Sequence, residues 1–437
     1  MAVSYAVSRV LKRASPFFYQ KRLESTVASL TKDEILILLR PPFTNFSNII
    51  RDAEKVVGYP TSFMNLRCLL SDEFANMALY LRKLVTHGGS VPRLGRATPC
   101  PRGSHGPERG GVAGGRLLLR SSNASKGGSR SNHLVMQTAK NVLYGDSKNL
   151  QPWGLIILLL SKSHEDQTRI LAELTEMMRT GHLIHRGIVN VPFAKRSTDA
   201  KSAIFGNKIA LLLGDYLLVT ANSMLANLRN SDVSYIISTA LKDLSEGEFF
   251  GERDEQNMPI PGKPKTTGKD YEITFDTNSI AVDEVIGKPR KEWTARTVYN
   301  GVSLLGRGCQ SAMVLDNQNR ETQNLAYQFG CHVGLAWQAA TEIQQLTSDS
   351  KERFCLASAP VLFALDSNPN LYQIITQSKK DVKDVDYEDL KFNILKTDAV
   401  DKTQMLYEEH AKKATAYIEG IGQNESVDMI KKLINTF

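Results

Sequence analysis

Two long stretches of the chain repeat apolar residues at three- and four-residue steps, which is the spacing of one face of an α-helix. The first stretch, 167–190, places on that face Leu171, Leu174, Met178, Gly181, Ile184 and Ile188. The second stretch, 324–346, places there Ala326, Phe329, Val333, Ala336, Ala340 and Ile343. Both stretches are therefore predicted to be long amphipathic helices.

A third stretch, 206–228, is apolar on nearly every side. This pattern predicts a helix that is buried inside a bundle or against another subunit. Three amphipathic segments follow between residues 390 and 437, and no stretch shows a convincing alternation of apolar and polar residues. The patterns predict an all-α fold, with one large helical domain over 45–437.

The net charge of +8 is unevenly distributed along the chain. Residues 1–23 carry +5 with no acidic residue, and residues 86–132 carry +7, so the remainder carries −4. The composition of residues 1–30 is typical of a mitochondrial transit peptide, the alternative being a disordered basic terminus. Because the remainder is slightly acidic and has no known nucleic-acid motif, we expect no nucleic-acid partner.

Two stretches interrupt the helical pattern. Residues 86–132 hold 11 of the 30 glycines, which favours a disordered Gly/Arg-rich insertion over an arm that binds RNA or anionic lipid. Residues 246–291 are rich in proline, glycine and charge, and are expected to form a flexible loop.

Two further features exclude classes of protein. The longest apolar run, 153–160, has eight residues, so no transmembrane segment is expected. The five cysteines are scattered and form no C-x-x-C pair, which argues against a disulfide framework or a zinc site and suits a reducing compartment.

Four segments resemble the trans-isoprenyl diphosphate synthase family, and they occur in the family's order. They are EMMRTGHLIHRGIVN (176–190), FGNKIALLLGDYLL (205–218), FGCHVGLAWQAATEIQQ (329–345) and SAPVLFAL (358–365). The resemblance implies a bundle of long antiparallel helices around a central cavity. Catalytic members of the family hold Mg²⁺ there with two DDxxD motifs, whose carboxylates share the ions that stabilise the departing diphosphate.

Both aspartate motifs are degenerate in this sequence. The first aligns on 186–190, where Arg186, Gly187 and Asn190 replace the aspartates. The second aligns on 341–345, where Thr341, Glu342 and Gln345 leave a single carboxylate. No metal site is therefore expected on this chain.

The diphosphate-binding residues of the family are also depleted. Its Gly-Lys-x-x-Arg motif aligns on 63–67 and keeps only Arg67, and its Lys-Thr pair aligns on Asn300 and Gly301. Arg67 and Arg186 are the candidates for a residual diphosphate contact. The scaffold positions of the family are retained, and the candidates for scaffold or interface roles are Gly206, Asn207, Lys208, Gly214, Asp215 and Gln338.

A scaffold that is kept without its chemistry resembles the non-catalytic, regulatory subunit of a heteromeric all-trans-polyprenyl diphosphate synthase. The resemblance implies a mitochondrial matrix protein that acts in isoprenoid and ubiquinone side-chain biosynthesis. It also implies a catalytic partner subunit, on which Mg²⁺ and prenyl diphosphates bind. The alternatives are a non-enzymatic isoprenoid-binding protein and a divergent, self-sufficient prenyltransferase.

Individual side chains leave alternatives open. Arg186 either grips a diphosphate or pairs with Glu342 across the old cavity, and the pair is favoured because it needs nothing from outside. His182 and His185 have a metal-ligand spacing, but helix packing is favoured. Asp215 and Lys208 are expected to make a buried helix–helix or interface hydrogen bond. The helix over 206–228 is the candidate subunit interface, with burial inside the monomer as the alternative.

Overall fold

The computed structural model describes residues 44–57, 153–161, 166–191, 198–265, 275, 277, 280–348, 353–377 and 382–436. The N-terminal half of the fold comprises α4 (Thr44–Val57), α7 (Trp153–Leu160), α8 (Asp166–Arg186), α9 (Thr198–Asn227) and α10 (Ser231–Gly247). The middle comprises α11 (Val282–Val285), α12 (Pro289–Thr297), the π-helical turn η3 (Val298–Val302), α13 (Ser303–Leu315) and α14 (Arg320–Thr347). The C-terminal part comprises α15 (Ala359–Ser367), α16 (Leu371–Gln377), the 3₁₀ turn η4 (Val382–Asp384), α17 (Tyr387–Ile394), α18 (Ala399–Ile421) and α19 (Glu425–Ile434).

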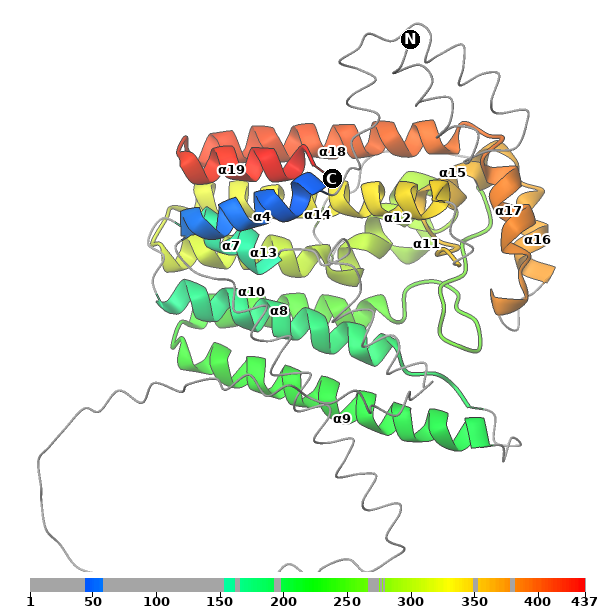
Figure 1. Ribbon diagram of the computed structural model, residues 1–437, viewed down its shortest axis with the longest axis horizontal. Coiled ribbons are helices and arrows are strands. Elements are labelled where there is room, and N and C mark those ends of the chain that lie inside the picture. The colour runs from blue at the N-terminus through cyan, green and yellow to red at the C-terminus, as the bar shows by residue number, and fades with distance from the viewer. Residues whose placement is uncertain are drawn as a thin grey trace, which may run out of the picture.

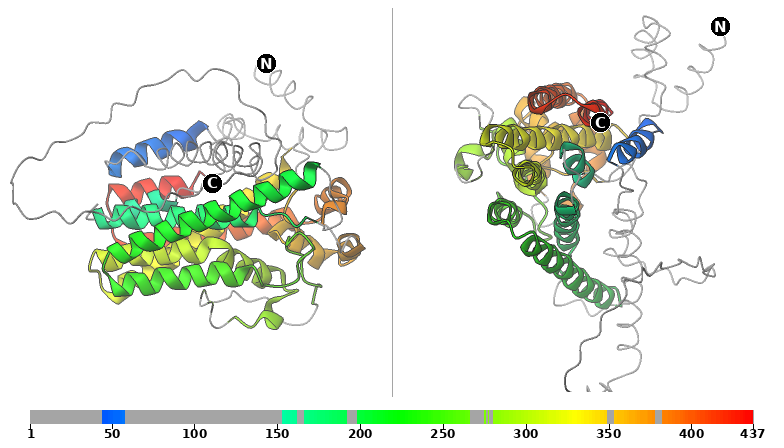
Figure 2. Two further views of the ribbon diagram at one scale, coloured as in Figure 1. Left: turned by 90° about the horizontal axis from the view of Figure 1, so that it is seen from below. Right: turned by 90° about the vertical axis from the view of Figure 1, so that its left-hand side faces the viewer.

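The long helices run side by side as a bundle, with α18 at one side and α9 at the other (Figures 1 and 2). The short helices α15, α16 and α17 cover one end of the bundle (Figure 1). The described residues contain no β-strand, and the one isolated bridge joins Arg253 to Pro259. The predicted all-α fold is confirmed.

The expected amphipathic faces form the core. On α8 the buried side chains include Leu171, Leu174 and Met178, which recur at the predicted steps. On α14, Phe329 is fully buried against the same core cluster, which also includes seven buried residues of α7. Burial of these faces is the main force that assembles the bundle.

Polar side chains at helix starts explain where several helices begin. Asn230, Asn319 and Asn424 each accept a backbone N–H from the first turn of α10, α14 and α19, respectively. Asp386 does the same for α17. Such caps satisfy donors that a helix start otherwise leaves unpaired.

The helix α9 is buried on one side only, so the alternative of burial inside the monomer is wrong for its other side. Its inner residues, among them Leu213 and Leu217, pack with Ile184 of α8. Large apolar side chains are exposed on its outer side, namely Ile204, Leu211, Leu212, Tyr216 and Val219. We call these five residues the outer face of α9.

Within the described residues, one segment is long and apolar enough to cross a membrane when judged by length and composition alone. It is Ala203–Asn227 of α9, and 39% of its most apolar window is buried inside the protein. The sequence-based expectation of no transmembrane segment overlooked this stretch because charges at Lys208 and Asp215 interrupt its apolar runs.

Several expectations lie outside the described residues. They concern the N-terminal segment 1–30, the insertion 86–132 and the arginine Arg67.

Candidate functional site

The first degenerate motif lies at the C-terminal end of α8. The helix ends at Arg186, four residues before the predicted end, and Gly187 closes it with a hydrogen bond to the carbonyl of Ile184. The chain then leaves the helix because the side-chain amide of Asn207 holds the backbone of Val189. Asn207 accepts from the amide of Val189 at 3.0 Å and donates to its carbonyl at 2.6 Å. The motif positions 186, 187 and 190 therefore do not share one face of a helix.

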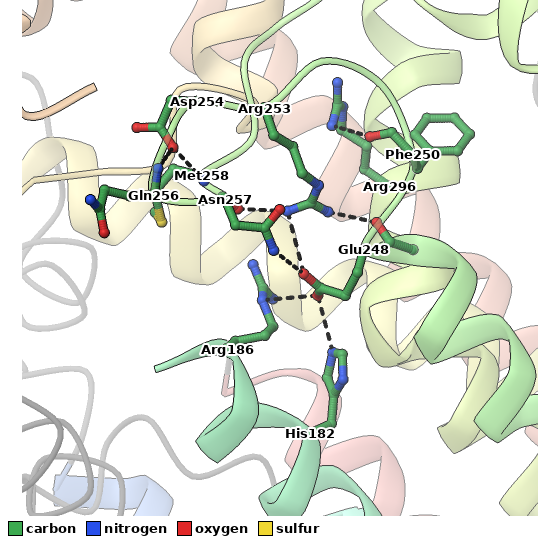
Figure 3. Close-up of polar contacts among 11 residues, drawn as sticks. His182, Arg186, Glu248, Phe250, Arg253, Asp254, Gln256, Asn257, Met258 and Arg296 are labelled. Atoms are coloured by element: carbon green, nitrogen blue, oxygen red, sulfur yellow. Dashed lines mark hydrogen bonds and ion pairs between the residues drawn. The ribbon is translucent and has the colours of Figure 1, made fainter. Parts of the chain in front are cut away.

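The carboxylate of Glu248 faces the first motif (Figure 3). Its Oε1 lies 3.4 Å from Nε of Arg186 and 3.7 Å from Nε2 of His182. Its Oε2 lies 3.5 Å from Nη1 of Arg253 and accepts a hydrogen bond from Asn257 at 3.0 Å. Glu248 thus balances the charge of two arginines.

Glu248 opens a segment that we call the strap, residues 248–262 (Figure 3). Arg253 donates to the carbonyls of Gly247 and Asn257, at 2.6 and 2.9 Å, and so folds the strap back on itself. The buried Arg296 donates to the carbonyls of Phe250 and Ile260, at 3.0 and 2.9 Å, and fixes the strap to α12. The stretch that was expected to be a flexible loop therefore contains a hydrogen-bonded element.

The buried carboxylate of Glu292 anchors the end of the strap. It accepts from the amides of Gly262 and Gly287, at 3.0 and 2.7 Å, and pairs with Arg296 at 2.9 Å. A buried ion pair of this kind is costly to break, because removal of one partner leaves a buried charge without compensation. This anchor does not depend on Glu248.

The other end of the first motif also contacts the strap. Asn190 donates its amide to Oε1 of Gln256 at 2.9 Å, and Gln256 donates to the carbonyl of Asn190 at 3.0 Å. The side chain of Asn190 donates to the carbonyl of Glu255. The motif positions 186 and 190 are thus both joined to the strap.

The second degenerate motif, on α14, holds its one acid in an internal network. Glu342 is 6% exposed and accepts hydrogen bonds from Trp293 Nε1 at 2.9 Å, the Ala359 amide at 2.8 Å and Gln338 Nε2 at 2.8 Å. It thereby caps the first turn of α15. The expected pair between Arg186 and Glu342 is wrong, because Arg186 pairs with Glu248 and Glu342 is enclosed by hydrogen-bond donors.

Neighbouring positions of the second motif have separate surroundings. The hydroxyl of Thr341 donates to the carbonyl of Trp337 at 2.8 Å within the helix, and Gln345 is exposed. They do not join Glu342 in one cluster.

The buried state of Glu342 makes stability depend on pH. Burial raises the pKa of Glu342 from 4.5 to about 7. Because the folded state binds this proton more tightly than the unfolded state, stability decreases as the pH rises from about 4.5 to 7. A glutamine at this position does not titrate. Between pH 5 and pH 8, the free energy of unfolding of the natural chain should therefore fall by about 2–3 kcal/mol relative to that of Glu342→Gln.

Urea unfolding at several pH values measures this effect. Glu321→Gln, at the exposed start of the same helix, is the matched control and should show no such change. A constant difference between Glu342→Gln and the natural chain across this range would show that Glu342 titrates normally.

At the position where the family has its Lys-Thr pair, the backbone is packed closely against the side chains of Arg179 and Trp153. Gly301 lies in η3 at φ +142°, and a Cβ there would be 2.5 Å from Nη1 of Arg179 and 2.8 Å from the ring of Trp153. The guanidinium of Arg179 lies 3.7 Å from the centre of the Trp153 ring, as a cation–π contact. Only glycine fits here, and Asn300 beside it supplies no cationic group in place of the lysine.

The two histidines of α8 contact different groups and form no common site. Burial and the nearby arginines, Arg186 first, lower the pKa of His182 to about 3, so its ring is neutral. The Nε2 atom of His185 lies 3.2 Å from the carbonyl of Leu211 and 3.4 Å from Oδ1 of Asp215. The ring fits there because Gly214 has no Cβ.

The pairing expected for Asp215 is wrong within this chain. Its side chain is 57% exposed and faces His185, and Lys208 is exposed as well. Gly206 is buried in α9, and Asn207 holds the backbone after α8, as described above.

The residues present do not fit a divalent metal. Within the described ranges, no three His, Cys, Asp or Glu side chains are grouped so that they could hold an ion. Mg²⁺ requires several oxygen ligands, whereas the end of α8 presents guanidinium groups and the acid of α14 is surrounded by donors.

Sequence reasoning missed Glu248, Arg253 and Arg179. Glu248 and Arg253 fall in a charged stretch that lacks helical periodicity, and Glu248 is 62 residues from its partner Arg186. One signal was available: Arg179, His182 and Arg186 follow one another at helical spacing, so they lie on one side of α8.

Comparisons with known proteins agree with this architecture. The family model described as polyprenyl synthetase matches residues 123–273. The chain is similar to the all trans-polyprenyl-diphosphate synthase PDSS2 of Homo sapiens, with 29% identity over 416 residues, covering 89% of this chain and 86% of that protein. The protein of the same name from Mus musculus is 31% identical over 341 residues, covering 73% of this chain and 68% of that protein.

A solved structure supports the fold alone. The polyprenyl synthase of Caulobacter crescentus, in complex with calcium and isoprenyl diphosphate, superposes with a TM-score of 0.51 at 17% sequence identity. The match covers 70% of this chain and 89% of that one. The bundle is therefore shared with this structure, although most of the sequence is not.

Proposed function

The chain belongs to the polyprenyl synthetase family, and we propose that it acts there as a non-catalytic, regulatory subunit of a heteromeric all-trans-polyprenyl diphosphate synthase. Its role is to bind and stabilise a catalytic subunit. In this proposal, Mg²⁺ and the prenyl diphosphates bind chiefly on that partner. The product is the side chain of ubiquinone, and the basic, acid-free composition of residues 1–23 supports action in the mitochondrial matrix.

The observation that carries the proposal is the replacement of metal ligands by internal contacts. Where the family places its first carboxylates, Arg186 is ion-paired with Glu248. Where it places the second set, the remaining acid, Glu342, is used to cap α15. Catalysis of this kind needs charge stabilisation of the leaving diphosphate, and neither position offers a metal ligand that is free to supply it.

The outer face of α9 supports a partner. Its five large apolar side chains are between 45% and 68% exposed, and they lie along a single helix at one side of the bundle (Figure 2). A row of apolar groups of this size is unusual on a lone subunit and is typical of the central part of a protein interface. The proposed occupant is the catalytic subunit.

Restoring the first aspartates is expected to produce no activity. In the triple variant Arg186→Asp, Gly187→Asp and Asn190→Asp, the new carboxylates do not share a helix face, because α8 ends at residue 186. The variant also leaves Glu248 without its partner Arg186 and leaves the Lys-Thr position unrepaired. The measurement is prenyl transfer without a partner, in the presence of Mg²⁺, with circular dichroism as the folding control.

Detectable product from this triple variant alone would contradict the proposal, since it would mean that the diphosphate site is still intact. The proposal itself is tested by prenyl transfer with and without a catalytic subunit.

A further inference from the structure

One side of α8 carries two guanidinium groups, with the neutral ring of His182 between them. Arg179, His182 and Arg186 follow one another along that side. Figure 3 shows Arg253 of the strap facing His182 and Arg186 across the carboxylate of Glu248. These groups are close enough that Arg179, Arg186 and Arg253 all act electrostatically on His182. Guanidinium groups gathered in this way form a site for a phosphate-like anion.

The carboxylate of Glu248 lies among these side chains, but its Oε1 atom makes no hydrogen bond to any of them. Its Oε1 atom is buried, yet no hydrogen bond reaches it within the described part of the chain, and the same holds for Nε2 of His182 and Nε of Arg253. The Oε1 atom lies 3.4 Å from Nε of Arg186 and 3.7 Å from Nε2 of the neutral His182, and both distances are longer than those of charge-assisted hydrogen bonds. Three buried polar atoms, one of them Oε1 itself, therefore lack a hydrogen bond among the described residues.

We propose that Glu248 is an internal ligand: the strap places its carboxylate among these cations and so keeps them from binding a phosphate-type anion. The carboxylate supplies negative charge but has too few oxygens to pair every donor. A diphosphate-sized anion has more oxygens and binds once Glu248 is removed or the strap lifts. This inference deepens the proposed function, because it explains how a cation-rich site stays closed in a non-catalytic subunit.

The fold permits Glu248 to change without loss of the strap. The far part of the strap is held by Arg296 and Glu292, through hydrogen bonds that do not involve Glu248. The near part keeps the bonds of Arg253 to the carbonyls of Gly247 and Asn257. Glu248→Gln also keeps an oxygen that can accept from Asn257, so this variant is expected to fold.

The test is binding of inorganic pyrophosphate to the full chain by calorimetry, without divalent metal. Glu248→Gln should bind roughly tenfold more tightly than the natural chain, because a competing charge within 4 Å is gone. Glu255→Gln is the matched control, since it removes the same charge from an exposed position on the same strap. The double variant Glu248→Gln with Arg186→Gln should return to the affinity of the natural chain.

Two results would overturn the inference. One is equal pyrophosphate affinity, or equal lack of binding, in Glu248→Gln and the natural chain. The other is tight binding that persists in the double variant. A second measurement checks that the strap is intact in the variant: hydrogen exchange at the amides of Gln256 and Met258, which donate to Asp254, should be the same in Glu248→Gln and in the natural chain. Faster exchange in Glu248→Gln would contradict the inference, because the strap would then depend on Glu248.

These experiments use neither a partner nor prenyl transfer. Failure of the internal-ligand inference therefore leaves the proposed function standing, whereas activity of the chain alone would remove the proposed function and leave the pyrophosphate result intact.

Discussion

Replacing Leu212 and Val219 together by aspartate should separate this chain from its catalytic partner and abolish the activity that depends on the pair. Both side chains belong to the outer face of α9, where they are 45% and 68% exposed, seven residues apart on the same side of the helix. Two carboxylates buried in an apolar interface would lose their hydration without gaining partners. We expect affinity to fall by roughly a hundredfold or more.

Co-purification of the two subunits and long-chain product formation measure this effect. The matched control is Phe392→Asp with Met405→Asp, which changes side chains that are 59% and 69% exposed on α17 and α18, away from α9 (Figure 1). Both double variants should remain folded, since their side chains contribute little to the core.

Two outcomes would reject the outer face of α9 as the subunit interface. In the first, the α9 variant and its control retain the partner equally well. In the second, the α9 variant keeps the partner but loses attachment to lipid vesicles, which would make the outer face a membrane contact. The second outcome is worth testing because Ala203–Asn227 has the length and composition of a membrane-crossing helix.

Replacing Glu342 by alanine should destabilise the chain by about 3 kcal/mol or more, the second large effect. The substitution removes the acceptor of Trp293 Nε1, of Gln338 Nε2 and of the amide that begins α15. Donors left buried without an acceptor are the costly part of this change, and the lost side-chain volume adds to it.

Urea unfolding at neutral pH is the measurement for Glu342→Ala. Gln345→Ala is the matched control, because Gln345 is exposed three residues further along the same helix and should change stability by less than about 0.5 kcal/mol. Equal effects of the two substitutions would mean that Glu342 does not hold α15 in place.

Much of the scaffold could be predicted from the sequence because it depends on local periodicity. The steps of Leu171, Leu174 and Met178 gave the buried face of α8, and the predicted helix over 324–346 corresponds closely to α14. The end of α8 could not be predicted in the same way. It is set by Asn207, which holds Val189 from the next helix, and such a contact has no signature in the apolar pattern.

The partners of the degenerate motifs were also beyond local reasoning. Position 186 was expected to pair across the cavity with Glu342, and the sequence offered no reason to prefer Glu248 in an aperiodic charged stretch. The apolar composition of α9 was informative in one respect and misleading in another. It correctly indicated a long helix with a buried apolar side, but apolar composition alone could not tell that the opposite side of this helix is exposed in this chain.

The central claim is that this family member assists catalysis without performing it, and one measurement tests it most directly. The chain, purified from about residue 30 onward, is incubated with Mg²⁺, farnesyl diphosphate and labelled isopentenyl diphosphate. It is assayed alone and after co-expression with an aspartate-motif synthase of the same organism, and that synthase is also assayed alone. The account predicts no product from this chain alone, and more long-chain product from the pair than from the synthase by itself. Product from this chain alone would contradict the account and would mean that other residues hold the metal.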